Sequence, residues 1–193
     1  MSEEILIEQC STTMAGLKTG SLFPCLGESC EQVACSLREL NRLLVPKGLR
    51  LIPLSLENGR ALLYLYRPER LKADLNDETA QSILKEREYP VHDPDRCVVC
   101  LARRMKAEAE FPHEVGLFLG YPPEDVDGFI RNKARGAKCV GTWKVYGDAD
   151  AAKKKFERYK KCAEVYGKAY RGGRCFERMV VAEHSASAAC AAD

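Results

Sequence analysis

The chain has 193 residues and a formal net charge of +2, and 46% of its residues are hydrophobic and 30% charged. This composition is ordinary for a soluble globular protein, and the length suffices for one domain with a sizeable core. The near-neutral charge, without a zinc-finger, helix-turn-helix or RNA-recognition signature, argues against a nucleic-acid partner. No apolar run approaches the roughly 20 residues that span a bilayer. The acidic N-terminus MSEEILIEQC lacks the basic region of a secretory signal, so we expect a cytoplasmic protein.

The ten cysteines allow two interpretations. In the reducing compartment expected here, most of them are small buried hydrophobic residues. Alternatively, several of them bind a metal or an iron–sulfur cluster. Cys97 and Cys100 form a CxxC pair, but no second pair follows at zinc-finger spacing. The spacing of Cys25, Cys30 and Cys35 matches no usual ligand pattern.

The N-terminal part is predicted to contain two helices separated by a loop. Residues 3–9 are amphipathic and predict a short helix, and residues 28–45 repeat apolar positions at helical spacing until a proline and a glycine end that helix. Residues 12–22 between them are mostly small, with two glycines and Lys18, and lack the order of a P-loop. This loop either exposes backbone N–H groups to an anion or is a turn between two apolar elements.

A β-hairpin is the clearest local signal. Residues 49–56 and 61–67 are strand-like runs joined by residues 57–60 (Glu-Asn-Gly-Arg), and Asn-Gly is the preferred type I′ turn. Pro53 lies inside the first run, and proline has no N–H to donate to a neighbouring strand. The first strand is therefore predicted to lie at a sheet edge or to carry a bulge.

Beyond the hairpin, the sequence predicts a domain of two packed halves, residues 1–90 and 91–171. A helix over residues 77–87, capped by Asn76, precedes a linker, and another helix begins at Pro94 after the cap residue Asp93.

The segment from Phe111 to Asp148 carries the most unusual mixture of residues in the chain. It holds His113, Glu114, four glycines that interrupt apolar runs, a Pro-Pro pair, a basic loop and the single tryptophan. VGLFLG is either a short strand or a buried helical turn, PPED starts a helix, and CVGTWKVYG is predicted as a strand. Such a mixture indicates a backbone shaped for binding.

Asp148 is predicted to cap the longest helix, which has an apolar stripe and a lysine-rich opposite face. That face either docks an acidic partner, such as an acidic redox protein, or is a solvated surface, because glutamates alternate with its lysines. Two glycines end this helix, and residues 172–193 are expected to form a flexible tail.

The neighbours His113 and Glu114 suggest an acid and a base. A metalloprotease motif is excluded, because leucine stands where its second histidine is required. A histidine that follows proline at the start of an apolar run is more often a hydrogen-bonded structural residue. The aromatic residues Tyr121, Trp143 and Tyr146 either line a flat pocket for an aromatic ligand or form one hydrophobic core.

The segments FPHEVGLFLGYPPEDVDGFI and GTWKVYGD, followed by a charged helix containing FERYKKC, resemble an uncharacterised bacterial family, a domain of unknown function found mostly in anaerobic Gram-positive bacteria. The segments TMAGLKTGSLF, SLRELNRLL and LLYLYRPERL also fit, so the resemblance covers roughly residues 5–170. The family has no established activity, and the resemblance implies an association with iron uptake or flavodoxin-type redox functions. Its pattern usually has a proline soon after the first cysteine. This chain has Ser11 and Thr12 there, which argues against a ligand role for Cys10.

Together these patterns predict an α/β protein of the α+β type, one compact domain with a small mixed sheet, a β-hairpin and about six helices. The leading hypothesis is a cytoplasmic protein that binds a small molecule or cofactor where residues 13–23 meet residues 111–122. The expected ligand-binding residues are His113, Glu114, Lys18, Thr19, Trp143 and Tyr121.

Two other functions stay open. One is an accessory protein for iron or haem, or a docking partner of a redox protein, with iron, haem or flavin as candidate cofactors. Its candidate metal ligands are Cys10, His113, Cys97 and Cys100. The other is an enzyme of unfamiliar type that uses His113 and Glu114 as acid and base.

Overall fold

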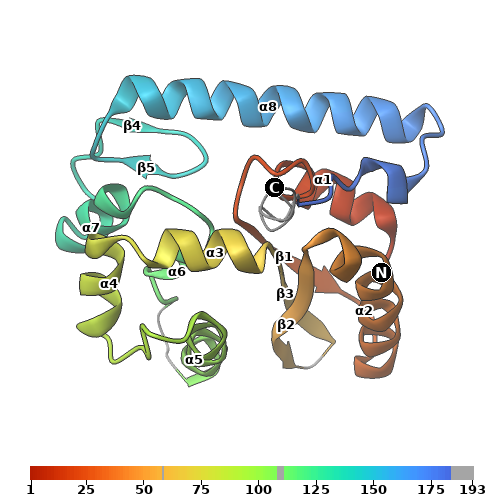
Figure 1. Ribbon diagram of the computed structural model, residues 1–193, viewed down its shortest axis with the longest axis horizontal. Helices are drawn as coiled ribbons and strands as arrows, with labels where there is room; N and C mark the ends of the chain where they lie inside the picture. The colour runs from red at the N-terminus through yellow and green to blue at the C-terminus, as the bar shows by residue number, and fades with distance from the viewer. Residues whose placement is uncertain (58, 108–110, 184–193) are drawn as a thin grey trace, which may run out of the picture.

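A computed structural model describes residues 1–57, 59–107 and 111–183. Within these residues the protein has eight α-helices, a three-stranded sheet of order β1-β3-β2, and a separate two-stranded hairpin (Figure 1). The predicted α+β architecture with a β-hairpin is confirmed. Every strand pair among the described residues is antiparallel.

The strands are β1 (Gly20–Leu26), β2 (Arg50–Glu57), β3 (Arg60–Tyr66), β4 (Cys139–Val140) and β5 (Lys144–Val145). The α-helices are α1 (Glu3–Met14), α2 (Cys30–Leu44), α3 (Pro68–Leu75), α4 (Glu78–Lys85), α5 (Pro94–Ala107), α6 (Val115–Phe118), α7 (Pro123–Arg131) and α8 (Ala149–Arg171). Two short 3₁₀ helices are η1 (Val45–Lys47) and η2 (Phe176–Met179).

Side-chain caps set the start of several helices. The side chains of Ser29 and Asp148 accept hydrogen bonds from backbone N–H groups in the first turns of α2 and α8. At α4 the cap is Asp77 and not the predicted Asn76, because the Asp77 carboxylate accepts from two first-turn N–H groups. Each cap of this kind stabilises a helix by about 1 kcal/mol.

The three-stranded sheet accommodates proline in its outer strands. β2 lies at one edge, and its register shifts between Pro53 and Ser55, so the predicted edge position and irregularity are both present. Asn58 of the predicted turn lies outside the described residues. β1 forms the other edge of the sheet. The predicted loop over residues 12–22 was therefore too long, since α1 runs to Met14 and β1 begins at Gly20.

Both faces of this sheet are buried against helices. On one face, Phe23, Leu63 and Leu65 pack with residues of α1, α2 and η2 in a first hydrophobic cluster. On the other face, Tyr64 and Tyr66 pack with residues of α3 to α7 in a second cluster. Because successive side chains of a strand point to opposite faces, burial of both faces gives β3 a continuous apolar run.

The helix α8 lies along one side of the molecule and links its two ends. In Figure 1 its N-terminal part passes over the β4–β5 hairpin, and its later part lies along α1. Trp143 and Val145 of the hairpin region form a third cluster with Ala152 of α8. The predicted single strand over CVGTWKVYG is thus a tight hairpin, which turns at residues 141–143.

The tail expected from residue 172 includes η2. Phe176 and Met179 of η2 are only 2% and 5% exposed and belong to the first cluster. The buried Arg67 also holds this segment, because its guanidinium donates both to the Met14 carbonyl at the end of α1 and to the Val181 carbonyl. Residues 184–193 lie outside the described residues.

Candidate functional site

The two segments predicted to form one site, residues 13–23 and 111–122, do meet in the fold. They meet, however, at a packed contact. A Cβ atom added at Gly20 would lie 2.7 Å from the Phe118 carbonyl oxygen, and one added at Gly120 would lie 2.5 Å from Thr19 Oγ1. Both distances are too short for any side chain, so these glycines allow two backbone segments to approach closely. Two cavities lie beside this contact.

The first cavity, here called the apolar cavity, lies between α6, α7 and the β4–β5 hairpin and has a volume of about 380 Å³. Its lining residues are mostly apolar and aromatic: Phe111, His113, Val115, Gly116, Leu119, Tyr121, Asp125, Val126, Phe129, Val140, Gly141, Thr142, Trp143 and Lys144. Three of the six predicted ligand-binding residues, His113, Tyr121 and Trp143, therefore line one cavity.

Aromatic contacts shape the walls of the apolar cavity. Trp143 stacks on Tyr121 with ring centroids 4.9 Å apart, and it meets the edge of Phe156 from α8 at 4.6 Å. Elsewhere in the lining, the exposed ring of His113 packs edge-on against Phe129, with centroids 5.0 Å apart. These geometries are the favoured ones for aromatic pairs, so the rings hold each other in place.

Asp125 fixes the hairpin wall of the apolar cavity to α7. Its carboxylate is 3% exposed and accepts hydrogen bonds from Trp143 Nε1 and from the backbone N–H groups of Tyr146 and Gly147, all at 2.7 Å. From the sequence, Asp125 is recognisable only as an acid at the helix start PPED. Its partners lie more than a dozen residues further along the chain, so local spacing could not reveal them.

Lys144 lines the apolar cavity together with its neighbour Trp143, whereas successive side chains of an extended strand point to opposite faces. Its ammonium lies 5.7 Å from the centroid of the Phe129 ring and donates a hydrogen bond to the Ala134 carbonyl at 2.8 Å. The tight turn between β4 and β5 accounts for this position, because the alternation of an extended strand does not hold across a turn.

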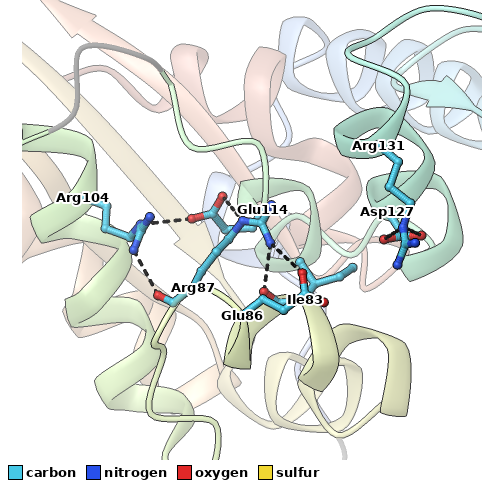
Figure 2. A network of polar contacts seen from close by, with 7 residues as sticks. All are labelled: Ile83, Glu86, Arg87, Arg104, Glu114, Asp127 and Arg131. Carbon is cyan, nitrogen blue, oxygen red and sulfur yellow. Dashed lines mark hydrogen bonds and ion pairs between the residues drawn. The ribbon is translucent and has the colours of Figure 1, made fainter.

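Glu114 is held in a buried polar cluster, which Figure 2 shows. Its carboxylate is 3% exposed and lies 3.4 Å from Arg87 Nε and 3.2 Å from Arg104 Nε. The Tyr89 hydroxyl donates to the same carboxylate at 2.9 Å. Burial, followed by the Glu114 charge, raises the pKa of Tyr89, so Tyr89 stays a neutral donor. This arrangement compensates the Glu114 charge and gives it a structural role.

Lys18 and Thr19 line a second cavity of about 250 Å³, here called the basic cavity, between the loop after α1, α3 and α8. Its lining residues are Leu17, Lys18, Thr19, Arg70, Asp74, Gly120, Lys155, Arg158 and Tyr159. The backbone N–H groups of Leu17 and Lys18 both donate to the Thr12 carbonyl, at 2.9 and 3.2 Å. Side chains, and not the backbone groups considered from the sequence, therefore give this cavity its charge.

The four candidate metal ligands are spread over the molecule. Cys10 lies in the first cluster and Cys97 in the second, and His113 lines the apolar cavity. Burial raises the pKa of the Cys10 thiol, and it raises that of Cys97 to about 11, so both stay protonated at neutral pH. Cys100 packs at the edge of the second cluster. Across the described parts of the chain, no three histidine, cysteine or acidic side chains are placed to hold a metal ion.

Comparison with protein families places the chain in a family without a known activity. The family model described as protein of unknown function (DUF3793) matches residues 6–180, so the chain belongs to this family. The resemblance to a domain of unknown function is thereby confirmed. Neither the curated proteins nor the solved structures contain a significant match. Of the helices in the described ranges, none has both the length and the hydropathy that a bilayer crossing requires.

Proposed function

We propose that this protein binds a small molecule with an apolar or aromatic body and an acidic group, and that the apolar cavity is its site. One observation carries the proposal: an aromatic-lined cavity of about 380 Å³ with a lysine and a histidine in its wall. Pockets that bind small molecules have volumes of about 300–1,000 Å³, a largely apolar lining and a few placed polar groups.

The aromatic walls suit a flat ligand. Trp143 and Tyr121 form a stacked pair in the lining, and Phe129 is a further aromatic lining residue. A flat ring between such walls buries a large apolar area and keeps the offset or edge-on geometry that aromatic pairs prefer. The contacts of Trp143 with Phe156 and of His113 with Phe129 hold these walls in the absence of a ligand, which lowers the entropic cost of binding.

The charges of the lining favour an acidic group on the ligand. Lys144 has three N–H donors, and the Ala134 carbonyl accepts one of them. The Asp125 carboxylate is also part of the lining, but it accepts hydrogen bonds from Trp143, Tyr146 and Gly147. An acidic group near Lys144 and His113 gains charge-assisted hydrogen bonds.

This role fits a cytoplasmic protein, because the nine cysteines among the described residues are all free thiols, as a reducing compartment favours. The roles in iron or haem handling, in docking an acidic redox protein, and in acid–base catalysis by His113 and Glu114 stay predictions. For the catalytic one, His113 lines the cavity whereas the Glu114 carboxylate is ion-paired with Arg87 and Arg104.

The test uses anilinonaphthalene sulfonate, an aromatic anion whose emission rises in apolar sites. Trp143 is the single tryptophan, so energy transfer from tryptophan to the bound probe reports its approach to this wall. We expect saturable binding of one probe molecule. Val140→Asp should weaken it about tenfold, because it puts a carboxylate beside the acidic group and removes apolar lining. Val140 is 70% exposed, so this change spares the core.

Val165→Asp is the matched control, since Val165 is 55% exposed on α8 and is not among the lining residues. It should leave the affinity of the probe unchanged within about twofold. A wild-type protein that shows no saturable energy transfer from Trp143 would refute the proposed function. Equal weakening by Val140→Asp and Val165→Asp would refute the location of the site.

A further inference from the structure

The basic cavity has an excess of positive charge. Four cationic side chains line it, Lys18 from the loop after α1, Arg70 from α3, and Lys155 and Arg158 from α8, together with one carboxylate, Asp74. Four positive charges less one negative charge leave a formal surplus of three. These side chains come from three segments far apart in the sequence, so the fold and not a local charge run gathers them.

This surplus is not neutralised inside the protein. Within residues 1–57, 59–107 and 111–183, none of the four cations forms an ion pair with a carboxylate. Arg70 donates to the Gly16 carbonyl, and Asp74 accepts a hydrogen bond from the Thr19 hydroxyl. The Lys18 ammonium lies 5.2 Å from the centroid of the Tyr121 ring, which attracts it but carries no net charge.

The kind of cation in the cavity indicates the kind of anion that it binds. Two guanidinium groups offer planar pairs of N–H donors, which match the oxygens of a phosphate group, and two ammonium groups add compact charges. The volume of about 250 Å³ suits a small group. We infer that the basic cavity binds a phosphate-class oxyanion, held by Lys18, Arg70, Lys155 and Arg158.

An aromatic wall separates this site from the apolar cavity. Tyr121 and Trp143 line the apolar cavity, and Tyr159 lines the basic cavity. The rings of Trp143 and Tyr159 lie 6.4 Å apart, and Lys18 rests on Tyr121 from the basic side. The oxyanion site therefore does not depend on the proposed function of the apolar cavity, and each has its own probe.

Isothermal titration calorimetry with inorganic phosphate, at neutral pH and at an ionic strength fixed with sodium chloride, tests this inference. The wild-type protein should bind one phosphate, and Lys155→Gln/Arg158→Gln should weaken binding about 100-fold, since two charge-assisted contacts are lost. Lys155 and Arg158 are exposed, so their exchange spares the core. Lys160→Gln/Lys161→Gln makes the same charge change at exposed positions of the same helix and should alter the affinity less than about twofold.

A parallel titration with adenosine monophosphate separates two sources of the same chemistry. Tighter binding of the nucleotide than of inorganic phosphate assigns the cavity to a phosphate carried on an organic molecule, and the reverse order assigns it to the free ion. The inference is overturned if neither probe binds saturably to the wild-type protein. It is also overturned if the two double variants weaken binding equally, because diffuse charge on α8 would then explain the attraction.

Discussion

The two cavities share an aromatic wall and have opposite chemistry. The apolar cavity is built from side chains of α6, α7 and the β4–β5 hairpin, and Asp125 fixes that hairpin. The basic cavity is lined by the charged ends of long side chains on α3, α8 and a loop. Interior packing thus shapes the first, whereas the second is defined by its four cationic side chains and one carboxylate. Substitutions should therefore damage the first through stability and the second through charge.

Asp125→Ala should damage the apolar cavity most. Removing the carboxylate leaves the Trp143 N–H and two backbone N–H groups without their acceptor, which should cost about 3 kcal/mol of unfolding free energy. Urea unfolding followed by Trp143 fluorescence measures this loss. Under native conditions the variant should no longer bind the sulfonate probe, but it should still bind phosphate.

Asp127→Ala is the control for this variant. Asp127 lies on the same helix but pairs with the exposed Arg131 one turn away, as Figure 2 shows, so the change should cost at most about 0.5 kcal/mol. Similar losses in Asp125→Ala and Asp127→Ala would contradict the assignment of Asp125 as the residue that fixes the hairpin.

Substitution of Glu114 should mainly lower stability, whereas substitution of its neighbour His113 should mainly weaken ligand binding. Glu114→Gln breaks the buried ion pairs with Arg87 and Arg104. We expect it to lower the unfolding free energy by about 2 kcal/mol, which is less than the usual cost of breaking a buried ion pair, because both arginines are partly exposed. His113→Ala should lower the unfolding free energy by less than about 0.5 kcal/mol but weaken binding of the sulfonate probe about threefold.

Thermal unfolding and probe titration of both variants measure this separation. Glu86→Gln serves as a control, since Glu86 meets Arg87 at 3.9 Å on the surface and its loss should have little effect on stability. A His113→Ala variant that unfolds while Glu114→Gln is unchanged would reverse the assigned roles.

A smaller effect is expected from Lys18, whose pKa is lowered to about 8, mainly by burial. Below this pH Lys18 is charged and attracts phosphate, so wild-type affinity should fall about threefold or more as the pH rises from about 8 to about 10. In Lys18→Met the affinity should be lower than that of the wild type at about pH 8 and below, and it should not change between about pH 8 and about pH 10. The variant should also unfold about 2 °C higher, because a desolvated cation is replaced by an apolar chain.

Calorimetric titration with phosphate across this pH range is the measurement. The titratable and charged groups around Lys18 are Cys10, Arg70, Asp74, Tyr121, Lys155, Arg158 and Tyr159. Burial raises the pKa of Cys10 and raises that of Tyr121 to about 12, and both Cys10 and Tyr121 therefore stay neutral in the window. The same pH dependence in Lys18→Met would assign the titration to another group.

Local signals predicted much of the fold. Helical spacing of apolar residues, the Asp148 cap and the Asn-Gly turn specify structure within a few residues, so most helices and the hairpin were recognisable. β1 was missed because Gly20 and Pro24 interrupt its apolar pattern, although both lie on an edge strand where they are tolerated. α3 was missed, although Pro68 directly after the second strand-like run begins it, as proline does in a first helical turn.

The candidate site was less predictable, because it depends on contacts between distant segments. Tyr121 and Trp143 were recognised by residue type, and the fold brings them together. The direction of the Glu114 side chain could not be predicted from the sequence. The ambiguous run after His113 is a helical turn, in which neighbouring side chains point about 100° apart. The lysine-rich face of the longest helix, which includes Arg158, was interpreted as a solvated or docking face, because the loop that completes the basic cavity is far away in sequence.

Amide chemical shifts of the isotope-labelled protein, titrated separately with inorganic phosphate and with anilinonaphthalene sulfonate, distinguish two binding sites from one. Phosphate should shift residues 16–20 and the first half of α8 around Lys155 and Arg158. The sulfonate should shift residues 113–119 and 140–145. Two distinct sets of shifts would support two sites of opposite chemistry. One common set, or scattered shifts over the surface, would contradict the presence of two separate sites.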